Sequence, residues 1–182
     1  EMVATNEERL LAHPSIIKYL YLNKRTRMSI ADRVLDLAVR NGKQVDIPAY
    51  KEAAEAILEE LITAPDPEPS PDDLLFVEAQ SEAERLAAEG VLETVTEDDE
   101  GKEIVQEKAK SLDQRIREMT VSQKIRAAML GTASTRALLV RDKNRLVAAA
   151  VVRSPLLQEG EAIAFAGSRA VSEDVLRIIA NN

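Results

Sequence analysis

The stretch LLVRDKNRLVAAAVVRSP, residues 138–155, contains a run from Leu146 to Val152 with no polar side chain. These seven residues cannot cross a membrane, because a membrane-spanning helix needs about 20. A helix that is apolar all round must be covered on every side. We therefore predict a buried helix here, whose alanines 148–150 let neighbouring helices approach closely.

Signals for further helices recur on both sides of this stretch. Asp142 is expected to cap the buried helix, and Ser154-Pro155 to end it. Thr120-Val121-Ser122-Gln123 has the pattern of a capping box, with a glycine stop at Gly131. Further helices are expected from Asn6, from Pro14 to about Leu22, from Ser29 to a stop at Gly42, from Pro48 to Ile62, from Ser70 to Glu89, from Lys102 to Glu118, from Thr132 or Ser134 to Val140, and over 157–167 and 172–180.

The middle of the chain has a different composition. Residues 64–71 hold four prolines, which block a helix and favour an extended spacer. Residues 94–101 are mostly acidic, which favours a mobile segment. We therefore divide the chain into an N-terminal helical block (1–63), a Pro- and acid-rich linker with one helix (64–101) and a C-terminal helical repeat block (102–182).

Self-similarity within the chain indicates a helical repeat. One module runs from Val147 through Ser154-Pro155 to Ala166, and a weaker copy runs from Ile16 to Ala38. Residues 175–181 look like the first helix of a further module. Short helices with short connections are typical of stacked helical pairs, in which each unit needs its neighbours to complete the core.

The module resembles the HEAT-like and variant leucine-rich class of bacterial helical repeats. The resemblance covers residues 138–181 best and 10–41 loosely, and residues 64–118 have no counterpart. The whole chain is also similar to a group of bacterial repeat proteins with a Pro- and acid-rich insert between two helical blocks. In this chain Leu157-Gln158 replaces the Thr-Pro pair of the repeat, and no cysteine is present for the iron–sulfur cluster of some variant leucine-rich proteins. The resemblance implies an all-α fold of right-handed stacked helical hairpins, an α-solenoid, with a flexible acidic insert.

Composition narrows the class of protein. Aromatic residues make up only 3% of the 182 residues, so the core must consist of Ala, Leu, Val and Ile. The absence of cysteine excludes disulfides, thiolate metal sites and cysteine nucleophiles within the chain. With no signal-peptide pattern or membrane span in the sequence, we expect a cytoplasmic protein.

The net charge of −8 is unevenly distributed. Residues 1–50 carry 8 basic and 6 acidic side chains, residues 51–120 carry 7 and 21, and residues 121–182 carry 9 and 5. Two weakly basic ends therefore flank a strongly acidic middle. The middle is either a solvated surface with a linker or a segment that docks on a basic groove.

Basic residues near helix ends in the C-terminal block are the candidate partner-binding site. They are expected to form a stripe along one edge of the helical stack, suited to an acidic protein partner, with ordinary solvated charges as the alternative. We therefore expect a non-enzymatic scaffold or adaptor that binds another protein. The other candidate is a nucleic-acid-associated regulator, which is less favoured because aromatic residues are few and the net charge is negative. The candidate residues are Arg136, Arg141, Lys143, Arg145, Arg153 and Arg169, with Arg177 further along the chain.

Catalytic and metal-binding patterns are weak. His13 is the only histidine, so one chain cannot assemble a histidine triad or a multi-histidine metal site. Residues 96–107 match part of a calcium-binding loop, but Thr96 occupies the position that needs aspartate. No phosphate-binding glycine loop is present. We expect no cofactor, no metal and no enzymatic activity.

The last expected helix ends abruptly. Val175, Leu176, Ile178 and Ile179 are apolar, although a terminal repeat normally has a polar outer face. We therefore expect the natural protein to continue beyond Asn182, and this chain to associate with a second copy through residues 171–180.

Overall fold

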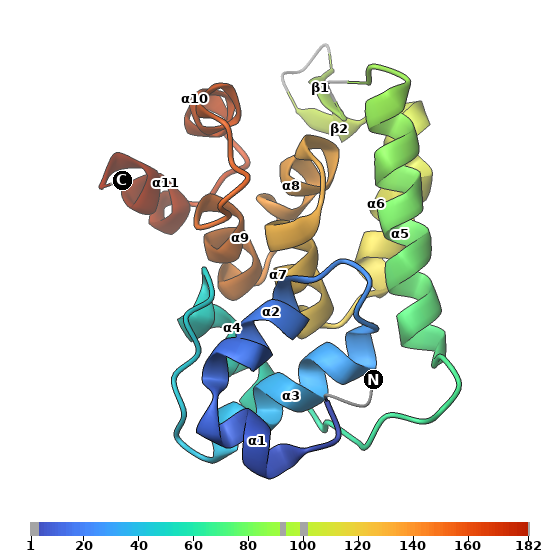
Figure 1. Ribbon diagram of the computed structural model, residues 1–182. Coiled ribbons are helices and arrows are strands. Elements are labelled where there is room, and N and C mark those ends of the chain that lie inside the picture. The colour runs from blue at the N-terminus through green and yellow to red at the C-terminus, as the bar shows by residue number, and fades with distance from the viewer. Residues whose placement is uncertain (1–3, 92–93, 99–101, 182) are drawn as a thin grey trace.

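The computed structural model describes residues 4–91, 94–98 and 102–181. Within these ranges the chain forms eleven α-helices, one 3-10 helix and a two-stranded hairpin (Figure 1). The chain is therefore mostly helical, as predicted, but the hairpin corrects the all-α assignment. The elements are α1 (Glu7–Ala12), α2 (Pro14–Leu22), α3 (Met28–Arg40), α4 (Tyr50–Glu59), α5 (Pro71–Ala88), β1 (Val95–Glu97), β2 (Glu103–Val105), η1 (Glu107–Ala109), α6 (Lys110–Glu118), α7 (Val121–Leu130), α8 (Ala133–Leu139), α9 (Arg145–Val152), α10 (Glu159–Gly167) and α11 (Glu173–Ala180).

The apolar run forms α9, and other helices cover it. Helices α4, α7, α8 and α11 pack against α9, and among residues 146–152 only Ala149 is partly exposed. The prediction of a buried helix is confirmed. Its cap differs from the prediction, because the side chain of Asn144 accepts the N–H of Leu146 at 2.9 Å. Asp142 instead accepts the N–H of Asn144 at 2.8 Å.

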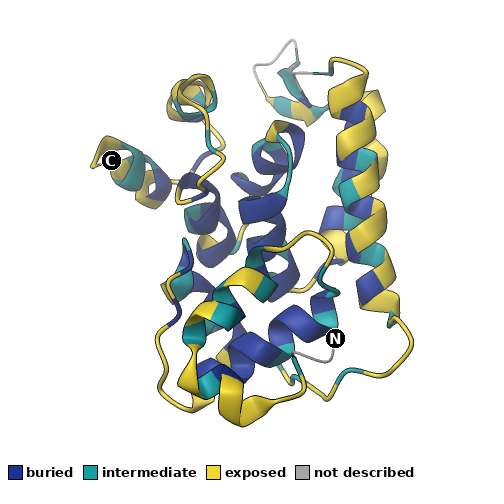
Figure 2. Ribbon diagram, in the orientation of Figure 1, coloured by how far each residue is buried: buried dark blue, intermediate teal, exposed yellow. Residues whose placement is uncertain are grey.

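The two helical blocks share one hydrophobic core. Helices α2 and α4 of the first block pack against α7 of the second, and α4 also packs against α9. Figure 2 shows the buried residues gathered where these helices meet, whereas α10 is largely exposed. Among the described residues, no helix is both long and apolar enough to cross a membrane.

Helix α5 belongs to the core, although the sequence suggested a flexible insert. Phe76, Ala79, Ala83 and Leu86 recur at helical spacing and are buried against α3, α6, α7 and α8. The helix begins after Ser70 as predicted, and Ser70 and Asp73 form a capping box in which each side chain accepts the backbone N–H of the other residue. Apart from the buried Asp73, the acidic side chains of α5 are exposed or half-buried, so they belong to its solvent face.

Residues 103–105 form strand β2, where the start of the charged helix was predicted. They pair antiparallel with β1, Val95 opposite Val105, because β-branched residues on both segments favour extended pairing. The helix follows only as η1 and α6. Thr96 of the calcium-loop template lies in β1, and part of that template falls outside the described residues. Among the described residues, no group of three or more histidine, cysteine or carboxylate side chains suits a metal ion.

Two predicted helix limits in the first block are wrong. Helix α3 begins at Met28, and Ser29 inside it bonds to the carboxylate of Asp73 rather than capping the helix itself. Helix α4 begins at Tyr50 and ends at Glu59, which leaves Leu61 outside it and 91% exposed. At these two positions, long-range contacts and the path of the chain toward the proline-rich segment determine the helix limit. The local sequence pattern does not.

Candidate functional site

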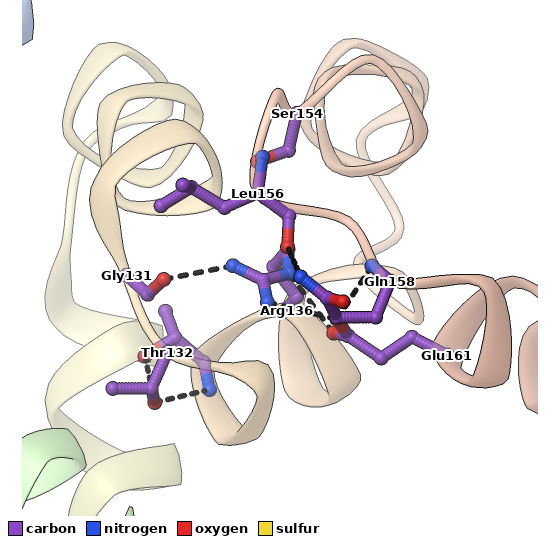
Figure 3. Close-up of polar contacts among 8 residues, drawn as sticks. Gly131, Thr132, Arg136, Ser154, Leu156, Gln158 and Glu161 are labelled. Carbon is purple, nitrogen blue, oxygen red and sulfur yellow. Dashed lines mark hydrogen bonds and ion pairs between the residues drawn. The ribbon is translucent and has the colours of Figure 1, made fainter.

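Arg136, the first residue of the predicted basic edge, lies inside the protein. Its guanidinium Nε and Nη2 donate to the two carboxylate oxygens of Glu161, each at 2.9 Å. Its Nη1 donates to the carbonyl oxygen of Gly131 at 2.8 Å. Figure 3 shows this guanidinium between the two acceptors. Because Arg136 is only 4% exposed, it joins α8 to α10 and presents no charge to a partner.

Arg141 is also used within the chain. It pairs with Glu103 of β2, and the hydroxyl of Ser168 donates to the same carboxylate at 2.6 Å. The hydrogen bond from Arg141 is the main reason that the pKa of Glu103 lies below its ordinary value. This cluster connects the hairpin to the loops that follow α8 and α10.

The remaining basic residues differ in how they are paired. Arg153 contacts Glu52 of α4 at 3.0 Å. Arg145 contacts Glu55 of α4 only at 3.5 Å, and it is 77% exposed. Lys143 and Arg169 are exposed, and neither side chain has a hydrogen bond or ion pair with another described residue. Carboxylates of the same chain therefore neutralise much of the predicted basic stripe.

A groove crosses α9 between α4 and α11. Its floor includes Leu146 and Ala149, so the one partly exposed residue of the apolar run opens onto it. Ile178 of α11 supplies an apolar wall, and the groove encloses about 310 Å³. The other lining residues are all charged: Lys51, Glu52, Glu55, Arg145 and Asp174.

Glu52, which lines this groove, has one carboxylate oxygen without a hydrogen-bond donor. The residue is 6% exposed, and its Oε1 pairs with Arg153. Its Oε2 is buried and has no hydrogen-bond donor among the described residues. The sequence alone does not indicate the burial of Glu52, because a glutamate in the first turn of a helix is ordinarily a solvated partner of the helix dipole.

Arg126 on α7 is a second residue that the sequence did not reveal. It is fully buried, and its guanidinium donates to the carbonyl oxygens of Tyr21, Asn23 and Thr26 at 2.9–3.0 Å. The guanidinium also lies 5.1 Å from the ring centre of Phe76, close enough for a cation–π contact. Burial lowers the pKa of Arg126. The residue fastens the loop between α2 and α3 to the centre of the fold.

A carboxyl group with an unusual pKa lies close to this arginine. Burial, and then the negative charge of Glu60, raise the pKa of Asp32 to about 8, although Arg126 and a hydrogen bond from Ser122 act in the opposite direction. Its Oδ1 has no hydrogen-bond partner among the described residues. Asp32 therefore retains its proton at neutral pH.

Comparison of the chain with protein-family models, with curated proteins and with solved structures found no match.

Proposed function

We propose that this chain is a non-enzymatic helical-repeat scaffold or adaptor that binds another protein. The packing order of the C-terminal helices supports a stack of right-handed hairpins of the HEAT-like or variant leucine-rich type. Helix α9 packs between α7 and α11, while α8 packs against α10. In stacked helical pairs, the first helices of successive pairs are expected to pack on one another, and so are the second helices.

The proposal rests on apolar side chains of α10 and α11 that are left partly uncovered at the end of this stack. Helix α10 buries only Phe165, and Ile163 on it is 67% exposed. Helix α11 buries only Val175, and its residues Leu176, Ile178 and Ile179 are half-buried. Apolar side chains left uncovered beside polar ones are typical of protein-binding surfaces.

A protein partner is better supported than a nucleic acid. Phosphate binding along the C-terminal edge needs several free cationic groups, but Arg136, Arg141 and Arg153 already bond to carboxylates. The same pairing weakens the case for a strongly acidic partner, because its carboxylates would compete with those of the chain itself.

The test is capture of a partner from native lysate, with variants that separate the proposed surface from the rest. Ile163→Glu places a charge on the exposed face of α10. Leu74→Glu makes the same change on α5, where Leu74 is 53% exposed. We expect a partner that binds wild type and Leu74→Glu but not Ile163→Glu.

Capture that neither variant disturbs contradicts the proposed surface. Two other measurements test the nucleic-acid and self-association alternatives. Micromolar binding of duplex or single-stranded oligonucleotides at low salt favours the nucleic-acid alternative. Concentration-dependent dimers in sedimentation, dispersed by Ile178→Glu, indicate self-association through residues 171–180.

A further inference from the structure

We propose that Asp32, Ser122 and Glu60 form a latch, which holds residues 60–65 against α3 and releases them when Asp32 loses its proton. These residues are the first part of the connection between α4 and α5, which runs past α3 (Figure 1). The latch does not depend on the scaffold role. Two features support it: a serine shared by two carboxyl groups, and a hollow beneath the connection whose charged lining is entirely acidic.

The shared serine lies at the start of α7. The backbone N–H of Ser122 donates to Oε1 of Glu60 at 2.9 Å, and its side chain hydrogen-bonds to the carboxyl group of Asp32. Because Ser122 is fully buried, water does not compete for its N–H while Glu60 is in place. Two carboxyl groups bonded to one residue lie close enough to repel each other once both are charged.

A hollow of about 190 Å³ lies between α3 and residues 60–66. Among the described residues, no lysine or arginine lines this hollow. A second hollow, of about 400 Å³, borders residues 64–66 on the side of Ile30 and Val34. The connection is therefore loosely packed on two sides, so little burial opposes its movement. The charged residues that line the first hollow are Asp32, Glu60, Asp66 and Asp72.

The surroundings of Asp32 determine when its charge appears. Burial is the largest influence, and it raises the pKa of Asp32 to about 8. Glu60 and Asp73 act in the same direction, whereas Arg126 opposes them. Tyr21 is uncharged, since burial raises the pKa of its hydroxyl. The groups that act on Asp32 thus come from four neighbouring parts of the fold: Tyr21 from α2, Glu60 from the end of α4, Asp73 from α5, and Arg126 and Ser122 from α7.

The pH dependence of the latch follows from where the proton is held. The closed latch retains the proton of Asp32 up to about pH 8, and the open latch releases it to solvent at lower pH because Glu60 has moved away. The open population therefore grows as the pH rises toward 8, by at most about tenfold per pH unit. Glu7 of α1 takes no part, because it pairs with Arg33.

Glu60 is the member of the pair that moves. Asp32 is buried within α3, whereas Glu60 is half-buried and follows the last residue of α4 with an extended backbone. The connection is next held at Asp66 and Pro67, whose carbonyl oxygens accept from Arg27 at 3.1 and 3.2 Å. Those bonds persist when Asp32 ionises, because an arginine keeps its charge at any relevant pH. Residues 60–65 are therefore the segment that is released.

Hydrogen exchange of the Ser122 amide, followed by NMR in the full chain, tests the latch. The protection factor divides the intrinsic exchange rate by the measured rate, which removes the direct effect of pH on exchange. In wild type it should fall about tenfold from pH 6 to pH 8, because the open latch exposes the amide. In Asp32→Asn it should stay constant. A constant protection factor in wild type overturns the proposal.

Glu60→Gln separates the latch from a general effect of Asp32 ionisation. Glutamine keeps an acceptor for the Ser122 N–H but carries no charge, so the decrease should shrink to about threefold or less. A decrease as large as that of wild type contradicts repulsion between the two carboxylates. Asp72→Asn removes an exposed carboxylate of the same hollow and should behave as wild type. Loss of the pH dependence in this control would contradict the specific pair.

A cysteine probe shows whether residues 60–65 themselves move. The chain contains no cysteine, so Ile62→Cys places a single thiol at a half-buried position of the segment. The rate of thiol labelling is divided by the rate in the same variant with Asp32→Asn, which cancels ionisation of the thiol itself. This ratio should rise about tenfold from pH 6 to pH 8. A flat ratio, even with loss of protection at Ser122, places the movement in α7 and overturns the latch.

Discussion

Replacement of Asp32 by asparagine should change how the stability of this protein depends on pH. Asp32 lies on α3 beneath the start of α7, where Ser122 hydrogen-bonds to its carboxyl group. The charged groups around it are Glu60 after α4, Asp73 on α5 and Arg126 on α7. Burial and the negative charge of Glu60 keep the carboxyl group protonated in the folded protein.

The size of the effect follows from the two pKa values. The folded protein retains the proton of Asp32 up to a pKa of about 8, whereas the ordinary value is 3.8. The contribution of Asp32 to stability is therefore complete below pH 4 and is lost as the pH rises toward 8. The loss is about 1.4 kcal/mol per pH unit, or about 3 kcal/mol between pH 5 and pH 7. Asparagine is uncharged in both states and contributes no such slope.

Urea unfolding of wild type and Asp32→Asn at pH 5, 6, 7 and 8 measures this difference. The free energy of unfolding of the variant, relative to wild type, should rise by about 3 kcal/mol from pH 5 to pH 7. Asp72→Asn, at an exposed position on α5, controls for removal of a surface carboxylate. Parallel curves for wild type and Asp32→Asn would refute the reasoning, because Asp32 would then be ionised in the folded protein.

Further substitutions test the packing of the core. Arg126→Met leaves three backbone carbonyl oxygens without their donor, so urea unfolding should show a loss of more than about 3 kcal/mol. Arg136→Ala and Glu161→Ala should each cost about 3–5 kcal/mol, and a double-mutant cycle that shows no coupling would contradict the buried pair. Gly131→Ala should lower the melting temperature, because a Cβ there would lie 2.5 Å from a backbone oxygen. Gly160→Ala, with nothing within 4 Å, should leave it nearly unchanged.

The sequence by itself determined the helical character of this protein and many of its helix limits. The helix start at Ser70 and the capping box at Thr120 formed as predicted, because their hydrogen bonds join residues three positions apart. The buried α9 was also predictable, since a run without polar side chains has no solvent face. Such signals depend on neighbours along the chain and are visible without the fold.

Only the tertiary structure decided which polar residues are buried and which remain at the surface. Arg136 meets Glu161 across 25 positions of sequence, and Arg126 meets Tyr21 across 105, so both arginines look like ordinary surface cations until α8, α10 and α2 are in place. The hairpin likewise depends on pairing between two short segments that have little preference alone. The groove exists because α4 and α11, far apart in sequence, both pack against α9. Burial and charge pairing depend on distances in space, and those distances arise only when the whole core has formed.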